Sequence, residues 1–139
     1  MTAFFWALVT ACIWGVVPLM EKIGLGGSPP TSGVMVRSLG IVAGLFLFGW
    51  FWSPWEALRA MSARSILLLA GGGLLASVIG QLAFYQALKT GALSQITPVA
   101  GAYPLVAALL GWWVLREPFT LQRLLGVLCV VIGVVLLRK

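Results

Sequence analysis

Long apolar stretches separated by short polar breaks dominate this chain. Each stretch is long enough to cross about 30 Å of hydrocarbon, since a helix rises about 1.5 Å per residue. Because lipid offers no partner for backbone N–H and C=O groups, each crossing must be helical. The pattern predicts an all-α integral membrane protein, a single domain over residues 1–139 built as a bundle of five transmembrane helices. The predicted helices cover residues 3–20, 32–52, 66–88, 94–115 and 119–137.

The composition agrees with a membrane protein and narrows its chemistry. Apolar residues make up 61% of the 139 residues and charged residues 9%, whereas soluble domains carry roughly 25% charged residues. The mean hydropathy is +1.08. The chain has no His and no Asp, three Glu and two Cys, which cannot build a metal cluster, a catalytic triad or a disulfide framework. We therefore expect a protein that is not an enzyme and that uses no metal ion or cofactor.

The basic residues are spread along the chain. Nine Lys and Arg against three Glu give a net charge of +6, a value that in a soluble protein would suggest nucleic acid as a partner. Here the cations fall one or two at a time between apolar stretches, where they meet lipid headgroups. The expected partner is therefore the lipid bilayer, and no nucleic acid is expected.

Five crossings would put the two termini on opposite sides of the membrane and divide the cations almost evenly between these sides. The side of the N-terminus would hold Arg59, Arg64, Arg116 and Arg123, and the opposite side Lys22, Lys89, Arg138 and Lys139. Arg37 lies inside the second stretch, nearer the opposite side. Such a balance gives the positive-inside rule little to act on, so one expectation is insertion in both orientations. The alternative is a single orientation set by the N-terminal amine or by a partner subunit.

The fourth apolar stretch contains two prolines. Pro98 and Pro104 each remove an N–H donor and disturb the carbonyl four residues earlier, so we expect an irregular first half of this helix. Gly101 and Tyr103 lie between them. In transporters, broken helices line the substrate path because the freed backbone groups bind ligand. A kinked structural helix is the alternative.

Few polar side chains fall inside the apolar stretches. Gln81 and Tyr85 are four residues apart on the third stretch and so share one helix face, with Ser77 one turn before them. Trp14 lies midway along the first stretch. Because an intramembrane amide or phenol usually points into the protein, we expect Gln81, Tyr85 and Trp14 to line a cavity. Ser77 is expected to bond to a neighbouring helix.

Charged residues inside the stretches are scarcer still. Arg37 is the clear intramembrane charge, and with Lys22 and Lys89 it would form a basic cavity mouth that favours an anionic or zwitterionic substrate. The alternative is that these three residues are interface anchors at helix ends. Glu21 falls at the end of the first stretch. A deep carboxylate, the usual proton carrier, is therefore missing unless the first helix extends to Leu25.

Several short motifs occur in order along the chain: Trp14-Gly15, Lys22, Arg37, Phe84-Tyr85-Gln86-Ala87-Leu88, Ala92, Pro98, Tyr103-Pro104, Leu115-Arg116-Glu117-Pro118, Gly126 and Gly133. Together they resemble the EamA domain of the drug/metabolite transporter superfamily. These residues are similar to the family's opening Trp-Gly…Lys pattern, its aromatic-x-Ala-Leu helix end, its Tyr-Pro helix, its Gly-Glu turn and its Gly-rich last helix. Arg116 stands where the family more often has Gly. The resemblance covers nearly the whole chain, as a half-size form with one domain.

The resemblance implies a transporter of amino acids or other small metabolites in the inner (plasma) membrane. The family usually has ten helices, formed by two such domains in inverted repeat. This chain holds one domain, so enclosing a path for alternating access would require two antiparallel copies, a homodimer. In the family the first, third and fourth helices line the cavity, which on matching positions implies substrate binding by Trp14, Gln81, Tyr85, Pro98 and Tyr103. The alternative is a non-transporting subunit of a heteromeric transporter or of a lipid-carrier flippase.

Overall fold

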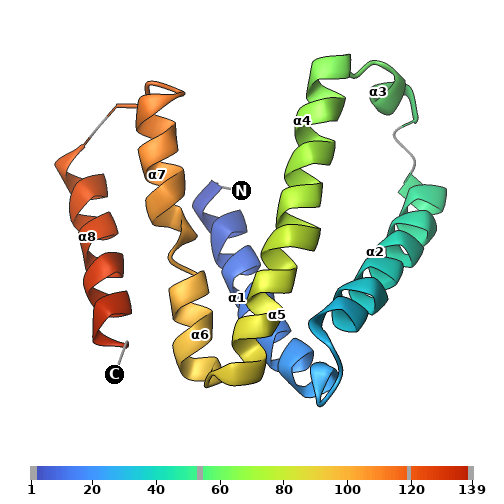
Figure 1. Ribbon diagram of the computed structural model, residues 1–139. Helices are drawn as coiled ribbons and strands as arrows, with labels where there is room; N and C mark the ends of the chain where they lie inside the picture. Colours follow the sequence, from blue (N-terminus) through green and yellow to red (C-terminus); the bar gives the residue numbers. More distant parts are fainter. Residues whose placement is uncertain (1–2, 53–54, 119, 138–139) are drawn as a thin grey trace. The chain divides into compact units, whose positions relative to one another are not determined.

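The computed structural model describes residues 3–52, 55–118 and 120–137. Within these ranges the chain is helical and contains no strand, which confirms the all-α prediction. Figure 1 shows the helices in chain order. The chain divides into two compact units, Met1–Lys89 and Thr90–Lys139.

The first unit begins with two long helices, α1 (Ala3–Leu25) and α2 (Pro30–Trp52). The predicted end of the first helix, at residue 20, is too early. Helix α1 continues through Glu21 and Lys22 because both residues favour a helix even though they interrupt the apolar stretch. It ends where Gly26 adopts a left-handed φ of 47°, a conformation that glycine reaches without strain.

The third predicted helix contains a wider turn. Helix α4 (Ala63–Leu74), the π-helical turn η1 (Leu75–Gly80) and helix α5 (Gln81–Thr90) follow one another without a break. The hydroxyl oxygen of Ser62 accepts a hydrogen bond from a backbone N–H of the first turn, which caps the start of α4. A short helix, α3 (Trp55–Arg59), precedes it.

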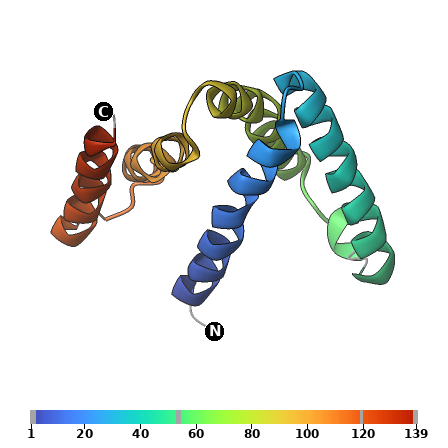
Figure 2. The same cartoon turned by 90° about the horizontal axis from the view of Figure 1, so that it is seen from below.

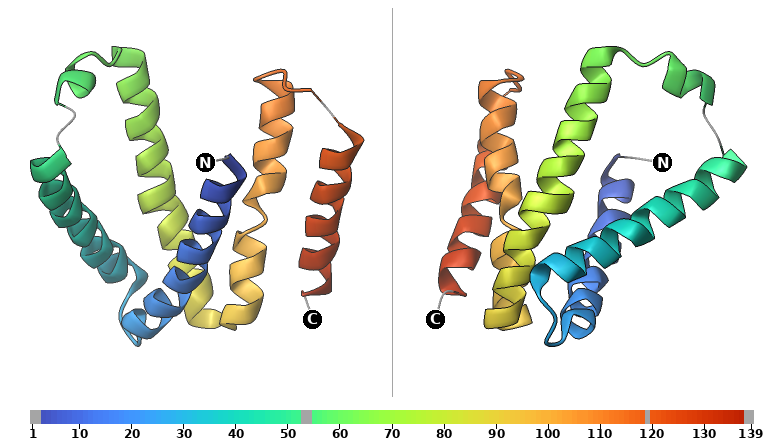
Figure 3. Two further views of the ribbon diagram at one scale, coloured as in Figure 1. Left: turned by 180° about the vertical axis from the view of Figure 1, so that it is seen from behind. Right: turned by 45° about the vertical axis from the view of Figure 1, so that its right-hand side comes forward.

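Figures 1, 2 and 3 show three segments side by side: the C-terminal end of α1, the start of α2 and helix α5. The side chains of Leu25, Val34, Tyr85 and Leu88 are buried. A Cβ atom added at Gly33 of α2 would lie 2.8 Å from Leu25 Cδ2 and 2.8 Å from Tyr85 Cε2. Because Gly33 has no side chain, the Tyr85 ring can lie against the backbone of α2.

Most large apolar side chains elsewhere in the helices are exposed. Four helical segments have the length and composition to cross a membrane: Ala3–Leu25, Pro30–Phe51, Ala63–Thr90 and Leu93–Trp113. Helix α8 (Leu121–Leu136) is apolar but has 16 residues, or about 24 Å, which is less than the roughly 30 Å of hydrocarbon. The predicted count of five spans is therefore not confirmed. Phe119, the predicted start of the fifth helix, lies outside the described residues.

The second unit contains the broken helix that the two prolines predict. Helix α6 (Leu93–Ala100) and helix α7 (Tyr103–Trp113) are separated by Gly101 and Ala102, and Pro104 lies in the first turn of α7. Pro104 has no N–H to donate to the carbonyl of Ala100. The irregularity expected in the first half of the fourth apolar stretch is thus confirmed.

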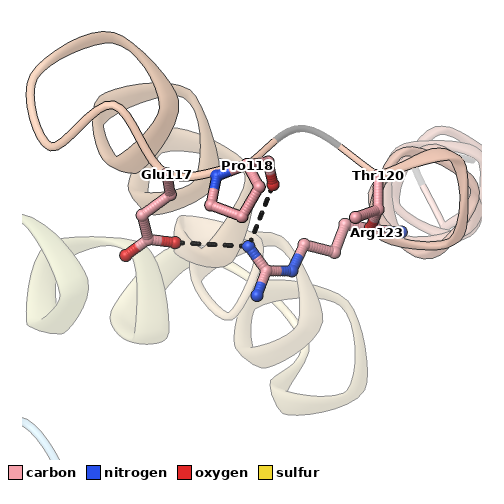
Figure 4. Close-up of polar contacts among 4 residues, drawn as sticks. All are labelled: Glu117, Pro118, Thr120 and Arg123. Carbon is pink, nitrogen blue, oxygen red and sulfur yellow. Dashed lines mark hydrogen bonds and ion pairs between the residues drawn. The ribbon is translucent and has the colours of Figure 1, made fainter.

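Side chains hold the turn between α7 and α8, as Figure 4 shows. Arg123 Nη1 lies 3.5 Å from Glu117 Oε2 and donates a hydrogen bond to the Pro118 carbonyl oxygen at 3.2 Å. The Thr120 hydroxyl oxygen accepts a hydrogen bond from the Arg123 N–H at 3.3 Å, which caps α8. Both side chains of the ion pair are more than half exposed, so the pair contributes about 1 kcal/mol or less.

Arg116, in the same turn, has a left-handed φ of 53°. It is the only non-glycine residue with a positive φ among the residues that the structure describes. This conformation costs an L-residue roughly 1–2 kcal/mol, whereas glycine adopts it freely. The position where the resembling family more often has Gly therefore has a backbone that suits glycine.

We expect Arg116→Gly to raise the free energy of unfolding by about 1 kcal/mol. Glycine removes the left-handed strain, and the greater freedom of its unfolded chain offsets part of the gain. Equilibrium unfolding in detergent micelles measures the difference. Arg116→Ala is the matched control, because it removes the guanidinium group and keeps the Cβ atom, and it should gain nothing. Equal stability of the two variants would show that this backbone carries no strain.

Candidate functional site

A cluster of polar side chains lies where α1, α2 and α5 meet. The carboxylate oxygen Oε1 of Glu21 accepts hydrogen bonds from Gln81 Nε2 at 2.9 Å and from Tyr85 Oη at 3.0 Å. The same oxygen lies 3.3 Å from Arg37 Nε in a salt bridge. Helix α1 supplies the acid, α2 the cation and α5 two neutral donors. We call these four residues, Glu21, Arg37, Gln81 and Tyr85, the Glu21 cluster.

The position of Glu21 corrects the interpretation that the apolar helices lack a carboxylate. Helix α1 does extend to Leu25, so Glu21 lies four residues inside the helix, with a side chain only 11% exposed. Removing an unpaired carboxylate from water is costly, which explains why three donors converge on one oxygen. Helix propensity could have identified Glu21, because Glu and Lys favour helices and Gly26-Gly27 is typical of a helix end.

Glu21 uses only part of the hydrogen-bonding capacity of Arg37. A guanidinium group has five N–H donors in a fixed fork, and Arg37 meets Glu21 through Nε. Its Nη1 atom is buried and has no hydrogen-bond partner within the described part of the chain. Buried donors without a partner are rare and cost about 1–3 kcal/mol. Arg37 therefore retains binding capacity next to a carboxylate of the protein itself.

An open cavity of about 500 Å³ borders the Glu21 cluster within the first unit. Its lining includes three residues of the cluster, Glu21, Arg37 and Tyr85, together with residues from the end of α1, the turn after it and the start of α2, among them Ser28, Ser32 and Gly33. The first turn of α2, which includes Ser32 and Gly33, has N–H groups and a helix dipole that favour negative charge. The volume falls in the range of about 300–1,000 Å³ that is typical of small-molecule sites.

The two lysines of the predicted cavity mouth lie differently from Arg37. Lys22 Nζ donates a hydrogen bond to the carbonyl oxygen of Leu88 at 2.6 Å. This contact is near the end of α5, where carbonyl groups lack helical partners and a cation is favoured. Lys89 has an exposed side chain. Of these three cations, Arg37 is the one that lines the cavity.

The other predicted binding residues lie outside this group of lining residues. Trp14 is on α1, seven residues before Glu21, with a side chain 58% exposed. Pro98 and Tyr103 belong to the second unit, on either side of the break between α6 and α7. Gln81 and Tyr85 join Arg37 in one cluster. Substrate binding by these residues stays a prediction.

Comparisons with known proteins agree with the motifs of the sequence. The chain matches the EamA-like transporter family over residues 1–139. It is also similar to an uncharacterized protein of Methanocaldococcus jannaschii, MJ1333.1, at 27% identity over 136 residues, which cover 98% of this chain and 96% of the relative. No solved structure matches the chain. Because the family match spans the whole chain, the predicted resemblance is confirmed, and the protein belongs to the EamA-like transporter family.

Proposed function

We propose that the protein is a transporter of small anionic or zwitterionic metabolites, such as amino-acid-like molecules. The observation that carries this proposal is the charge pair at the cavity surface, where Arg37 Nε and Glu21 Oε1 lie 3.3 Å apart. A guanidinium group can bind a carboxylate, and a carboxylate can bind an ammonium group. The family match supports transport of the drug/metabolite type.

Substrate binding in this proposal involves five residues taken from polarity and from matching family positions: Trp14, Gln81, Tyr85, Pro98 and Tyr103. Gln81 and Tyr85 are supported by their place in the Glu21 cluster. The two residues of the second unit are supported by the helix break, because the Ala100 carbonyl lacks the N–H that Pro104 would have supplied. Freed carbonyl groups of broken helices bind substrates and ions in transporters.

The proposed assembly is an antiparallel homodimer in the inner (plasma) membrane that works by alternating access. The family match covers residues 1–139 as one domain, and two antiparallel copies of this domain would enclose a path between them. If the fifth apolar stretch also crosses the membrane, the cations divide almost equally between the two sides, which supports insertion in both orientations. No cofactor or metal ion forms part of the proposal.

Two orientation-biased variants test the transporter and its assembly together. One variant replaces Arg59 and Arg64 by Gln, and the other replaces Arg138 and Lys139 by Gln. Because cations are retained on the cytoplasmic side, the two variants should insert in opposite orientations. We expect little uptake of labelled amino acids by cells that express either variant alone, and uptake close to the wild-type level when both are expressed.

Cysteine labelling from outside the cell serves as the control for orientation. Ser28→Cys and Ser62→Cys report on the two sides, in a background where Cys12 and Cys129 are replaced by Ser. Full uptake by either variant alone would contradict the antiparallel pair and leave the transporter in place. No uptake by any form, with a single labelled orientation of the wild type, would favour the non-transporting subunit of a heteromeric transporter or of a lipid-carrier flippase.

A further inference from the structure

We infer that the cavity beside Arg37 binds a carboxylate anion together with a proton, and that Glu21 releases Arg37 and accepts that proton. This inference rests on the proposed transport function and adds the coupling ion to it. Three observations carry it: the contact between Glu21 and Arg37, the buried Nη1 atom of Arg37, and the charges around the cavity.

The contact between Glu21 and Arg37 is weaker than the contact that a free carboxylate could make with Arg37. One oxygen of Glu21 meets one nitrogen of Arg37, at 3.3 Å. Carboxylates bind arginine best through two parallel N–H···O hydrogen bonds, which are shorter, about 2.7–2.9 Å. Arg37 Nη1 is buried without a partner within the described ranges. A carboxylate that enters the cavity can therefore offer Arg37 a better contact than Glu21 does.

The charge balance of the cluster explains the role of the proton. Glu21 and Arg37 are the charged residues among those that line the cavity in the described structure, and their charges cancel. An added carboxylate would leave one net negative charge in a partly buried site between membrane helices, which is costly. If Glu21 takes one proton from water, the site is neutral again.

In the inferred exchange, the substrate carboxylate replaces Glu21 as the ionic partner of Arg37. The ion pair between Arg37 and Glu21 breaks, an ion pair between Arg37 and the substrate carboxylate forms, and a new O–H bond forms on Glu21. The groups that face Glu21 are Arg37 from α2 and Gln81 and Tyr85 from α5. Lys22, its neighbour on α1, donates to the carbonyl oxygen of Leu88. The carboxylate and the proton therefore bind as an electrically neutral pair.

Proton uptake on ligand binding is the measurement that tests this inference. Purified wild-type protein in detergent is titrated with the monocarboxylates acetate and propionate by calorimetry, in buffers of different ionisation enthalpy. We expect about one proton taken up per carboxylate bound, and an affinity that falls as the pH rises from 6 to 8, because the binding of proton and anion is reciprocal. The probe carboxylates stay ionised over this range. Acetamide is the neutral control and should not bind.

Variants of Glu21 identify the proton acceptor. Glu21→Gln should bind the same probes without proton uptake, independently of pH, and at least about tenfold more tightly than the wild type at pH 8, because Arg37 no longer has an ionic partner to lose. Glu21→Asp keeps a carboxylic acid at this position and should keep the proton uptake. If Glu21→Gln fails to fold, this variant tests whether the acid at position 21 accepts the proton. Glu117→Gln changes an exposed acid of the second unit and should behave as the wild type.

Each result decides between the two proposals. Carboxylate binding without proton uptake by the wild type would overturn the coupling, as would equal proton uptake by Glu21→Gln. If no carboxylate probe binds while cells still take up labelled amino acids, the inferred binding of a carboxylate with a proton is wrong and the proposed transport function stands. Loss of all uptake in the orientation experiment would instead count against the proposed function.

Discussion

Replacing Arg37 by Gln is expected to raise the KM for a carboxylate-bearing substrate about 10- to 100-fold. Hydrogen bonds to charged groups contribute about 1.5–3 kcal/mol each, and every 1.4 kcal/mol changes an affinity about tenfold. Among the cavity-lining residues that the structure describes, Arg37 is the cation, so no neighbour can replace it. Initial rates of uptake in proteoliposomes measure the effect.

Two matched variants show whether the change in KM comes from losing a cation at the cavity or from losing any cation of this unit. Lys89→Gln removes an exposed cation from the same unit and should leave KM unchanged, since Lys89 does not line the cavity. Arg37→Lys keeps the charge and loses the planar fork, so an intermediate KM is expected. Equal effects of Arg37→Gln and Lys89→Gln would mean that Arg37 acts only as an anchor at the membrane interface.

Adding one methyl group at Gly33 is expected to lower the free energy of unfolding by about 1–3 kcal/mol and to reduce uptake. The new Cβ atom would lie 2.8 Å from Cε2 of the Tyr85 ring and 2.8 Å from Leu25 Cδ2. The aromatic ring is rigid and Tyr85 is 3% exposed, so it must shift as a whole. Its hydroxyl group, which donates to Glu21 Oε1 at 3.0 Å, would shift with it.

Gly40→Ala is the matched control for Gly33→Ala, on the same helix. A Cβ atom at Gly40 would have no atom within 4 Å in the described structure. Alanine favours a helix over glycine by about 0.5–1 kcal/mol, so this variant should be slightly more stable than the wild type. Unfolding in detergent and uptake in proteoliposomes measure both variants. Equal unfolding free energies and equal uptake for the two variants would show that the close approach of Tyr85 and Leu25 to Gly33 does not affect stability.

The fold followed from the sequence wherever one residue type has one dominant physical effect. Apolar length predicted an all-helical protein, although the predicted count of five spans is not confirmed. The break in the fourth helix lies just before Pro104, where a missing N–H acts locally, whereas Pro98 lies inside α6. Helix ends were less predictable. An apolar stretch stops at the first charge, whereas a helix stops only where the backbone turns, as it does at Gly26. For this reason the predicted first helix ended at residue 20 and left Glu21 outside, whereas α1 includes it.

The site was predictable only in part, for a similar reason. Gln81 and Tyr85 lie four residues apart, so sequence spacing alone put them on one face. Their convergence with Glu21 and Arg37 depends on how three helices meet, which no local pattern records. Gly33 was missed because its role depends on side chains outside α2, which no pattern within α2 can indicate. Its close contacts are with the side chain of Tyr85 on α5 and with that of Leu25.

The Glu21 cluster lies close to the ends of its helices. Glu21 is four residues, about 6 Å, before the end of α1, and Arg37 is seven residues, about 10 Å, after the start of α2. In the proposed antiparallel pair, each membrane face would therefore carry one such cluster. A half-turn about the twofold axis would then convert the inward-open form into the outward-open form, so symmetry requires both forms to have the same free energy. Such a pair would have no built-in direction, and the gradients of substrate and proton alone would decide whether it imports or exports.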